Sequence, residues 1–421
     1  MPETSSLYEC NYYILMLLLM TWSVFSTPLR ASGIGGEDCC ADELVKKGFE
    51  NVHVTKRHDT LFVGFENRVY RWEVRGLAEA IILLMPLLDD SATLSLTCLQ
   101  TGIPVVTVLL TKQQYLGLVT QTSSTETFTA SVKALLPVTS YKQVTERKPG
   151  LNRSYAKFDF FVSPLFRAQF SNFDQPLEME LGIVPSVQVS FVKGMRLLAQ
   201  VILPVYNNLE PKGYHIRPGL MVLSQTFRLP GNLFATIGAG YFTRNRYGIN
   251  GEVRKYFFNG KLALGASLGY TGSAAIQNGR WVYTGITTFT WGADAAYRFS
   301  KPDLTVKAGY GRYLFGDMGW RVDVSREFGE ISIGFFAMQT GGITNGGFNF
   351  IVPIPPRRYS TKHAVRVRPA SYVPWEYRAV GLPPQGRMYS TGTGIKEFMF
   401  NLNPDYIRTH LANEIIRNIK N

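Results

Sequence analysis

Residues 155–356 are dominated by long stretches in which apolar residues alternate with small or polar ones. In KLALGASLGY (261–270), leucines at 262, 264 and 268 alternate with alanine, glycine and serine. A period of two is typical of a β-strand with one apolar face. A soluble β-sandwich also alternates, but its strands usually have about five or six residues. Strands of about ten residues or more have the length with which a tilted strand crosses a bilayer.

We count about twelve strands of this kind, separated by turn sequences such as FFNGK, SKPD and TNGG. The connections leave no room for crossover helices, so the sheet must be antiparallel. In lipid every backbone group needs a partner, and an antiparallel sheet provides one by closing on itself. The sequence therefore predicts a mainly β fold, an antiparallel outer-membrane β-barrel of about twelve strands over 155–356. Its longest predicted strand is Arg280–Ser300.

Residues 41–121 have a different pattern and predict a small α/β domain ahead of the barrel. Helices and strands are expected in the order αββαββ, with a short first helix at Asp42–Lys47. The second helix begins at Glu73 and ends near Pro86, because a proline cannot continue the helical hydrogen bonds. A polar linker, 122–154, connects this domain to the strands.

The C-terminal tail, 357–421, begins with basic residues and ends in a predicted amphipathic helix. Asn403 and Pro404 are suited to its N-cap and first turn. Apolar residues then recur every four positions, at Ile407, Leu411, Ile415 and Ile419. This stripe predicts a helix that docks on the α/β domain or barrel mouth, or alternatively one that binds a membrane surface or a partner.

The N-terminus contains one continuous apolar run, Tyr12–Phe25. Its fourteen residues fall short of the roughly 20 that a spanning helix needs, and they fit the apolar region of a signal peptide. We therefore expect a signal peptide over 1–33, although no lysine or arginine precedes Tyr12. Export would place the α/β domain in the periplasm and the barrel in the outer membrane.

The formal charge of +13, from 44 basic and 31 acidic residues, indicates an anionic partner. Nucleic acid is the common choice, but here the basic residues are spread singly through strands instead of clustering on one helix. This spread favours an acidic polysaccharide or the headgroups of outer-membrane lipid. Four basic residues are placed by alternation on the face away from lipid: Arg254, Arg298, Lys307 and Arg321. They predict a path for an anionic polymer; alternatively they only pair with Asp294 and Asp323 inside the barrel.

Enzyme motifs are weak in this chain. GASLG (265–269) matches the G-x-S-x-G pattern of serine hydrolases, but that motif requires a strand-to-helix turn, and here it lies within a predicted strand. His53 and His58 are better explained as solvated or hydrogen-bonded side chains than as metal ligands. We therefore predict no catalytic residue, no metal and no cofactor.

Several segments resemble the YjbH family of exopolysaccharide-biosynthesis outer-membrane proteins, whose relatives occur in group 4 capsule loci. The resemblance is carried by DTLFVGFENRVYRWEVRGLAEAI, YFTRNRYGINGEVRKYFFNGKLALGASLGYTG, AGYGRYLFGDMGWRVDVSREFGEISIGFFA and GGFNFIVPIPPRR. It implies an outer-membrane barrel with a periplasmic α/β module that takes part in secretion or assembly of an extracellular polysaccharide. Members are usually longer, with a further β-rich half before the α/β module, so this chain departs from the family pattern.

We therefore expect a non-enzymatic outer-membrane protein that takes part in exopolysaccharide or capsule secretion or assembly. Its expected partners are outer-membrane lipid, an anionic polysaccharide and periplasmic or outer-membrane export proteins, but not nucleic acid. Two alternatives stay open at this point. One is a passive porin or structural barrel, and the other is a lipid-modifying outer-membrane enzyme that would need Ser267.

Overall fold

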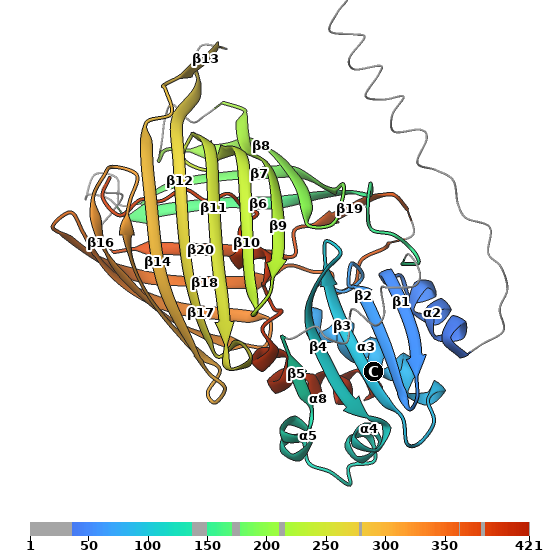
Figure 1. Cartoon of the computed structure of the whole chain (residues 1–421). Coiled ribbons are helices and arrows are strands. Elements are labelled where there is room, and N and C mark those ends of the chain that lie inside the picture. The colour runs from blue at the N-terminus through green and yellow to red at the C-terminus, as the bar shows by residue number, and fades with distance from the viewer. Residues whose placement is uncertain are drawn as a thin grey trace, which may run out of the picture.

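The protein is known from a computed structural model, which describes residues 36–136, 150–170, 177–209, 215–277, 280–361, 363–379 and 384–420. The predicted signal peptide lies outside these residues. The chain forms a small α/β unit at one end of a large curved sheet (Figure 1). The structure is thus mainly β with an α/β part ahead of the large sheet, as the sequence predicts.

The α/β unit is built on a five-stranded sheet in the order β1-β2-β3-β4-β5. Strands β2 and β3 are parallel because helix α3 crosses between them, and the other neighbours are antiparallel. Its elements are α2 (Gly36–Lys47), β1 (Glu50–Arg57), β2 (Thr60–Glu66), α3 (Glu73–Leu84), η2 (Met85–Leu87), β3 (Thr93–Gln100), β4 (Ile103–Thr111), α4 (Lys112–Val119), α5 (Thr125–Ser131) and β5 (Lys133–Leu135).

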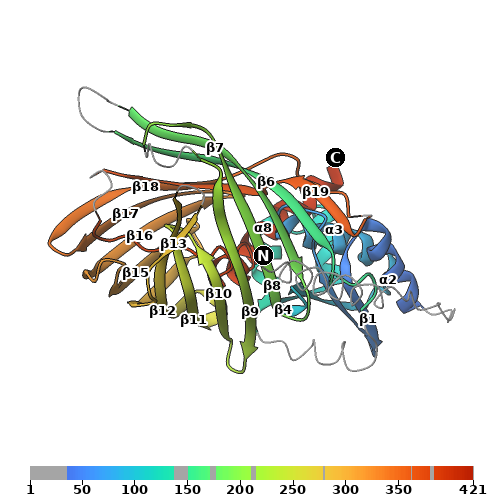
Figure 2. The same ribbon diagram turned by 90° about the horizontal axis from the view of Figure 1, so that it is seen from above.

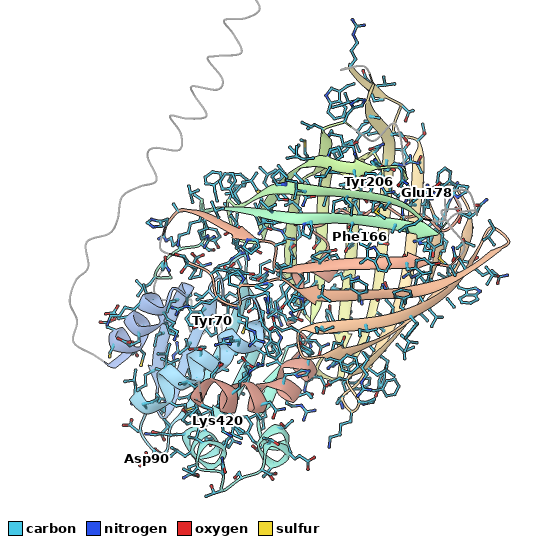
Figure 3. All side chains as sticks on the ribbon, turned by 180° about the vertical axis from the view of Figure 1, so that it is seen from behind. Tyr70, Asp90, Phe166, Glu178, Tyr206 and Lys420 are labelled. Atoms are coloured by element: carbon cyan, nitrogen blue, oxygen red, sulfur yellow. The ribbon has the colours of Figure 1, made fainter. Side chains whose placement is uncertain are left out.

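Helix α8 (Pro404–Lys420) returns from the C-terminus and packs against α3 and α5. Ile407, Leu411 and Ile415 are fully buried, whereas Ile419 is 42% exposed near the end of the helix. The Trp72 indole donates a hydrogen bond of 2.9 Å to the Tyr406 hydroxyl within this contact. Figure 3 shows Lys420, at the end of α8, over the α/β unit. The helix therefore docks on the α/β unit, which is one of the alternatives that the sequence left open.

The predicted linker, 122–154, differs from the structure because α5 and β5 fall within it. Ser124 caps α5 by accepting a hydrogen bond from the Thr127 backbone, and Phe128 is buried in the core. Strand β5 then pairs with β4 at the edge of the sheet. The Thr- and Ser-rich composition indicated a loop, but these side chains cap a short helix whose one apolar residue is enough to dock it.

The large sheet is 15-stranded. Its order is β19-β6-β7-β8-β9-β10-β11-β12-β14-β15-β16-β17-β18-β20, with β13 paired to β12. The strands are β6 (Phe158–Phe170), β7 (Leu177–Ser190), β8 (Met195–Asn207), β9 (Arg217–Leu229), β10 (Leu233–Phe242), β11 (Arg246–Phe257), β12 (Leu262–Gln277), β13 (Arg280–Tyr283), β14 (Thr288–Phe299), β15 (Leu304–Arg312), β16 (Met318–Phe328), β17 (Ile331–Thr340), β18 (Ile343–Pro353), β19 (Val365–Pro369) and β20 (Tyr372–Arg378).

The strand count differs from the predicted twelve in two places. The predicted strand Arg280–Ser300 is divided into β13 and β14, because the chain leaves the ladder with β12 between Tyr283 and Thr288. The predicted tail, 357–421, also contributes β19 and β20. VRVRP does alternate, but β19 has 5 residues and β20 has 7, so both are shorter than the long alternating stretches by which the other strands were recognised.

The apolar face of the large sheet points outward. Leu268 is 58% exposed and Phe335 is 66% exposed, and comparable side chains project from most strands (Figure 3). The set includes Phe160, Ile183, Leu223, Ile237, Ile249, Leu268, Phe289 and Phe335. The other face carries buried polar residues, such as Thr226 and Thr271, together with buried apolar residues, such as Val222 and Phe242. This arrangement is opposite to that of soluble proteins, whose sheets bury the apolar face.

The sheet curls so that β20 approaches β6 (Figure 2), but among the described residues no strand ladder joins these two strands. Strand β19 pairs with β6 in parallel, and the Ala370 amide donates to the Val162 carbonyl at 2.9 Å. Further along, the alternation of backbone direction places the nitrogen of Pro164 on the free edge of β6 and that of Pro374 on the free edge of β20. A proline nitrogen has no hydrogen, so neither residue can donate a hydrogen bond to a ladder there. Among the described residues, the predicted closure is therefore not completed by a ladder between β6 and β20.

A buried ionic cluster attaches the α/β unit to the large sheet. Arg366 on β19 contacts Glu50 on β1 at 2.6 Å and Asp159 on β6 at 2.8 Å. Lys157 contacts the same Glu50 at 2.8 Å. Burial raises the pKa of Glu50, although Arg366 and Lys157 oppose this effect. Because these charges lie in the contact itself, each part supplies the counter-charges of the other.

Two arginines make further contacts between the parts. Arg71, just ahead of α3, forms a bidentate pair with Glu330 in the turn between β16 and β17, with N–O distances of 2.7 and 2.9 Å. Arg228 on β9 donates to the carbonyls of Pro104 and Val105 at 2.6 and 2.8 Å. The α/β unit therefore contacts one end of the large sheet at three places: β6, β9 and the turn between β16 and β17.

Candidate functional site: the interior of the large sheet

The interior, meaning the space on the concave polar face of the large sheet, contains the chain's own tail. Residues 384–403 pass along it from the end far from the α/β unit to the end beside it. At the far end the Gly386 amide donates to Asp317 at 2.7 Å, and at the near end Asn403 donates to the Gly260 carbonyl at 2.8 Å. Helix α8 follows directly, so this internal segment is tethered to the α/β unit.

Side chains of the internal segment pack against successive strands. Tyr389 stacks on Phe242, with ring centroids 5.1 Å apart, and its hydroxyl donates to Asn250 at 2.8 Å. The Ile395 amide donates to Glu252 at 2.9 Å. Phe398, in the short helix α7 (Ile395–Phe398), packs on Phe234 near the α/β unit. These contacts fill the interior along β10 and β11.

Two glycines make this packing possible. Gly392 has φ +66°, and a Cβ there would lie 2.3 Å from Leu220 on the wall. A Cβ at Gly269 on β12 would lie 1.7 Å from the Tyr389 hydroxyl. Gly269 is the last residue of GASLG, and the first, Gly265, makes room for Arg254. The glycines of this motif therefore serve packing, and Ser267 lies within β12, not on a strand-to-helix turn.

Two of the four predicted basic residues, Arg254 and Lys307, share one carboxylate. Arg254 pairs with Asp294, and the Lys307 amine lies 3.4 Å from the same side chain. They line an interior cavity of about 230 Å³ together with Glu252, Lys396 and Glu397. The cations and carboxylates of this cavity are equal in number, so it has no excess of positive charge.

The other two basic residues do not line that cavity. Arg321 contacts Asp323 and Glu376, both at 2.7 Å. Arg298 lies at the α/β end, is only 5% exposed and contacts Asp303 at 2.6 Å and Glu327 at 2.7 Å. The structure therefore places Arg254 and Lys307 together but does not bring all four residues to one site.

A second basic group, which the sequence did not single out, lies at the end of the interior far from the α/β unit. We call it the distal arginine cluster; its members are Arg167, Arg217, Arg244, Arg246, Arg378 and Arg387. The residues come from four strands, one turn and the tail, at separations in sequence that give no local pattern. The only sequence signal is that most of them lie where strands begin or end.

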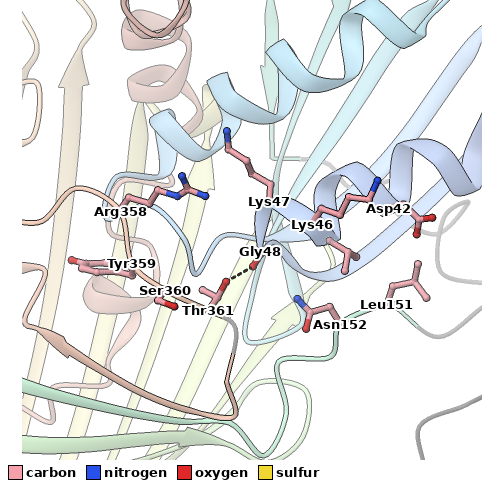
Figure 4. A pocket seen from close by; sticks show the side chains of 11 residues that line it. Asp42, Lys46, Lys47, Gly48, Leu151, Asn152, Arg358, Tyr359, Ser360 and Thr361 are labelled. Atoms are coloured by element: carbon pink, nitrogen blue, oxygen red, sulfur yellow. Dashed lines mark hydrogen bonds between the residues drawn. The ribbon is translucent and has the colours of Figure 1, made fainter. Parts of the chain in front are cut away.

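A second cleft lies outside the interior, where α2 meets residues 151–152 and 358–361 (Figure 4). It has a volume of about 760 Å³. Lys46 contacts Glu43 at 2.6 Å and Lys47 contacts Glu79 at 2.8 Å, so these two cations are paired. Thr361 donates to the Gly48 carbonyl at 3.2 Å across the cleft.

Within the described parts of the chain, no cluster of three or more His, Cys, Asp or Glu side chains is arranged to hold a metal ion. The described helices include none with the length and apolar character to span a membrane.

A family model described as "Exopolysaccharide biosynthesis protein YbjH" matches residues 30–220 and 216–381. These two matches cover the α/β unit and almost all of the large sheet. The chain belongs to the YjbH family. No curated protein matches it. The resemblance predicted from the sequence is therefore confirmed.

Among solved structures, this YjbH-family chain is similar to a loop-deletion mutant of OmpT, an outer membrane protein of Vibrio cholerae. The alignment has 8% identity and a TM-score of 0.25, and covers 46% of this chain and 85% of OmpT. A TM-score this low supports no conclusion about the fold, so family membership rests on the family model alone.

Proposed function

We propose that this protein is an outer-membrane β-barrel that takes part, without catalysis, in secretion or assembly of an exopolysaccharide. Membership of an exopolysaccharide-biosynthesis family supports a role in polysaccharide production or export. The α/β unit would lie in the periplasm, where other export proteins could dock on it.

The observation that carries the membrane part of this proposal is the outward apolar face. Exposed side chains such as Ile237, Leu268 and Phe335 form a surface far larger than the apolar patches of soluble monomers. In a bilayer the same surface is solvated by acyl chains. The charged side chains on the inner face stay away from lipid, and backbone groups pair within the sheet. The strands, most with ten or more residues, are long enough to cross.

The filled interior favours a platform for assembly, or a route that must be unblocked, over a passive open pore. Tyr389, Ile395 and Phe398 of the internal segment occupy space that solute would otherwise use. In planar bilayers we expect the purified protein to show little steady conductance. A large, constant conductance would favour the passive-porin alternative.

The central test is deletion of the gene in its native host, with complementation by the full-length chain. We expect surface exopolysaccharide to fall, and the protein to fractionate with outer membrane and to require detergent for extraction. Ser267→Ala should restore the polysaccharide as well as wild type does. Unchanged polysaccharide after deletion would refute the role, and failure of Ser267→Ala alone would favour an enzyme.

A further inference from the structure

We propose that the distal arginine cluster binds the carboxylate groups of an acidic saccharide. This inference rests on the proposed function, because it names the chemistry of the polymer that the protein handles. It also moves the expected anion site from the wall of the interior to its far end.

The cluster is held together by the internal segment and by one buried glutamate. Arg378 donates to the Gly386 carbonyl at 3.4 Å, and Arg244 donates to the Met388 carbonyl at 3.0 Å. Arg387 therefore lies between two residues that are each bound by another arginine. On the neighbouring strands, Arg167 and Arg217 both pair with Glu180, which is completely buried.

Arg244 connects these two groups. Burial, together with the nearby charges of Arg378, Arg387 and Arg167, lowers the pKa of Arg244 to about 10, so its guanidinium is still charged at neutral pH. Arg246 follows at the start of β11, paired in register with Phe242, and donates to Thr288 at 3.2 Å. Like charges are thus held close together at one end of the interior.

The cluster has more positive charge than its carboxylates balance. Among the described residues, six arginines lie with four carboxylates, a formal charge of +2: Glu178, Glu180, Asp317 and Glu376. Positive charge is therefore in excess among the described residues of the cluster, in contrast to the balanced cavity around Arg254 and Lys307.

Guanidinium groups suit carboxylates because they can donate two parallel hydrogen bonds to one group. Several arginines spread around an opening would attract a polymer with a repeated acidic unit without holding any unit tightly. The site therefore fits a saccharide with spaced carboxylates better than a single compact anion.

The test uses the full-length protein in detergent micelles and a fluorescently labelled oligogalacturonate, with binding measured by fluorescence anisotropy. We expect wild type to bind it, to bind more weakly as salt is raised, and to ignore a neutral maltodextrin of the same length. Replacing two charges in Arg244→Gln/Arg387→Gln should weaken binding about ten-fold. Arg246→Gln should weaken it about three-fold, and keeps the test informative if the double variant does not fold.

The matched control is Lys255→Gln/Arg326→Gln, which removes two cations from the outward face near the α/β end. It should leave binding within about two-fold of wild type. Equal loss in the control, or equal binding of maltodextrin, would overturn the site. If deletion lowers surface polysaccharide but the purified protein does not bind oligogalacturonate, this inference fails and the proposed function stands. If deletion has no effect, the proposed function fails whatever the binding result.

Discussion

The two parts of this molecule bury their side chains in opposite ways. In the α/β unit, Leu77, Ile81 and Ile415 are fully buried in an apolar core between helices and sheet. In the large sheet, apolar residues such as Leu268 point outward, and the inner face combines threonine, serine and ion pairs with apolar residues that pack on the internal segment. The α/β unit therefore buries its apolar side chains as a protein in water does, whereas the large sheet exposes them as a protein in lipid does.

The two parts also differ in how charged side chains are stabilised. At the contact between the parts, carboxylates and arginines are buried but pair across it, as Glu50, Arg366 and Asp159 do. Within the interior, pairs such as Arg254 and Asp294 lie on the concave face of the large sheet. At the distal arginine cluster, by contrast, positive charge is in excess among the described residues. The comparison can be tested at each of these places.

The largest effect is expected at the contact between the parts. Arg366→Met leaves the carboxylates of Glu50 and Asp159 without their main counter-charge, which should cost about 3 to 5 kcal/mol of unfolding free energy. Urea unfolding in detergent micelles, followed by tryptophan fluorescence, measures this loss. Arg326→Met, at an exposed arginine, should change stability by less than about 0.5 kcal/mol. Similar losses in both variants would mean that the ionic cluster does not hold the parts together.

The next effect tests the sidedness of the large sheet with two neighbouring residues. Leu268→Arg places a charge on the outward face and should cost about 2 to 4 kcal/mol in a bilayer. Ser267→Arg places it inward, beside the cavity that contains Glu252 and Asp294, and should be tolerated better. Heat-resistant folded protein in the membrane fraction is the measurement. If the inward change were the more damaging one, the outward face would not be the lipid face.

A third effect tests the docking of α8. Ile415→Ala removes a fully buried side chain and should lower the unfolding free energy by about 2 kcal/mol or more. Ile419→Ala, one turn later and 42% exposed, should have a much smaller effect. Protease sensitivity of the α8 end measures the difference. Equal sensitivity in both variants would contradict docking through the apolar stripe.

Patterns with a physical period were predictable from the sequence. The alternation at 262–270 fixed strand type and face, and the four-residue spacing from Ile407 to Ile415 fixed a helix with one buried side. Both follow from side-chain geometry within a single element. The inward placement of Arg254 and Lys307 was predictable for the same reason, whereas the polymer path itself stays a prediction.

Features that depend on pairing between distant residues were not predictable. Glu50 and Arg366 are 316 residues apart, and no local pattern connects them. The internal segment reads as a glycine- and proline-rich tail, because its packing partners, such as Phe242 and Glu252, lie on strands more than a hundred residues earlier. The absence of a ladder between the described residues of β6 and β20 was also not predictable, because these two strands lie far apart along the chain.

The last prediction concerns how the stability of the α/β unit depends on pH. Burial raises the pKa of Glu73, in the first turn of α3, to about 8, against the opposing effects of Asn67 and Arg68. The folded unit therefore holds a proton that the unfolded chain releases above about pH 4.5, and its stability should fall as pH rises from there to about 8.

Glu73→Gln imitates the protonated side chain and should remove this dependence. The variant should match wild type near pH 5 and melt several degrees higher near pH 8.5, because it has no proton to lose in this range. Glu126→Gln, at an exposed glutamate, is the control and should not change the pH profile. If Glu73→Gln kept the wild-type profile, Glu73 would be ionised in the folded protein, and its charge would have to be stabilised by Asn67 and Arg68.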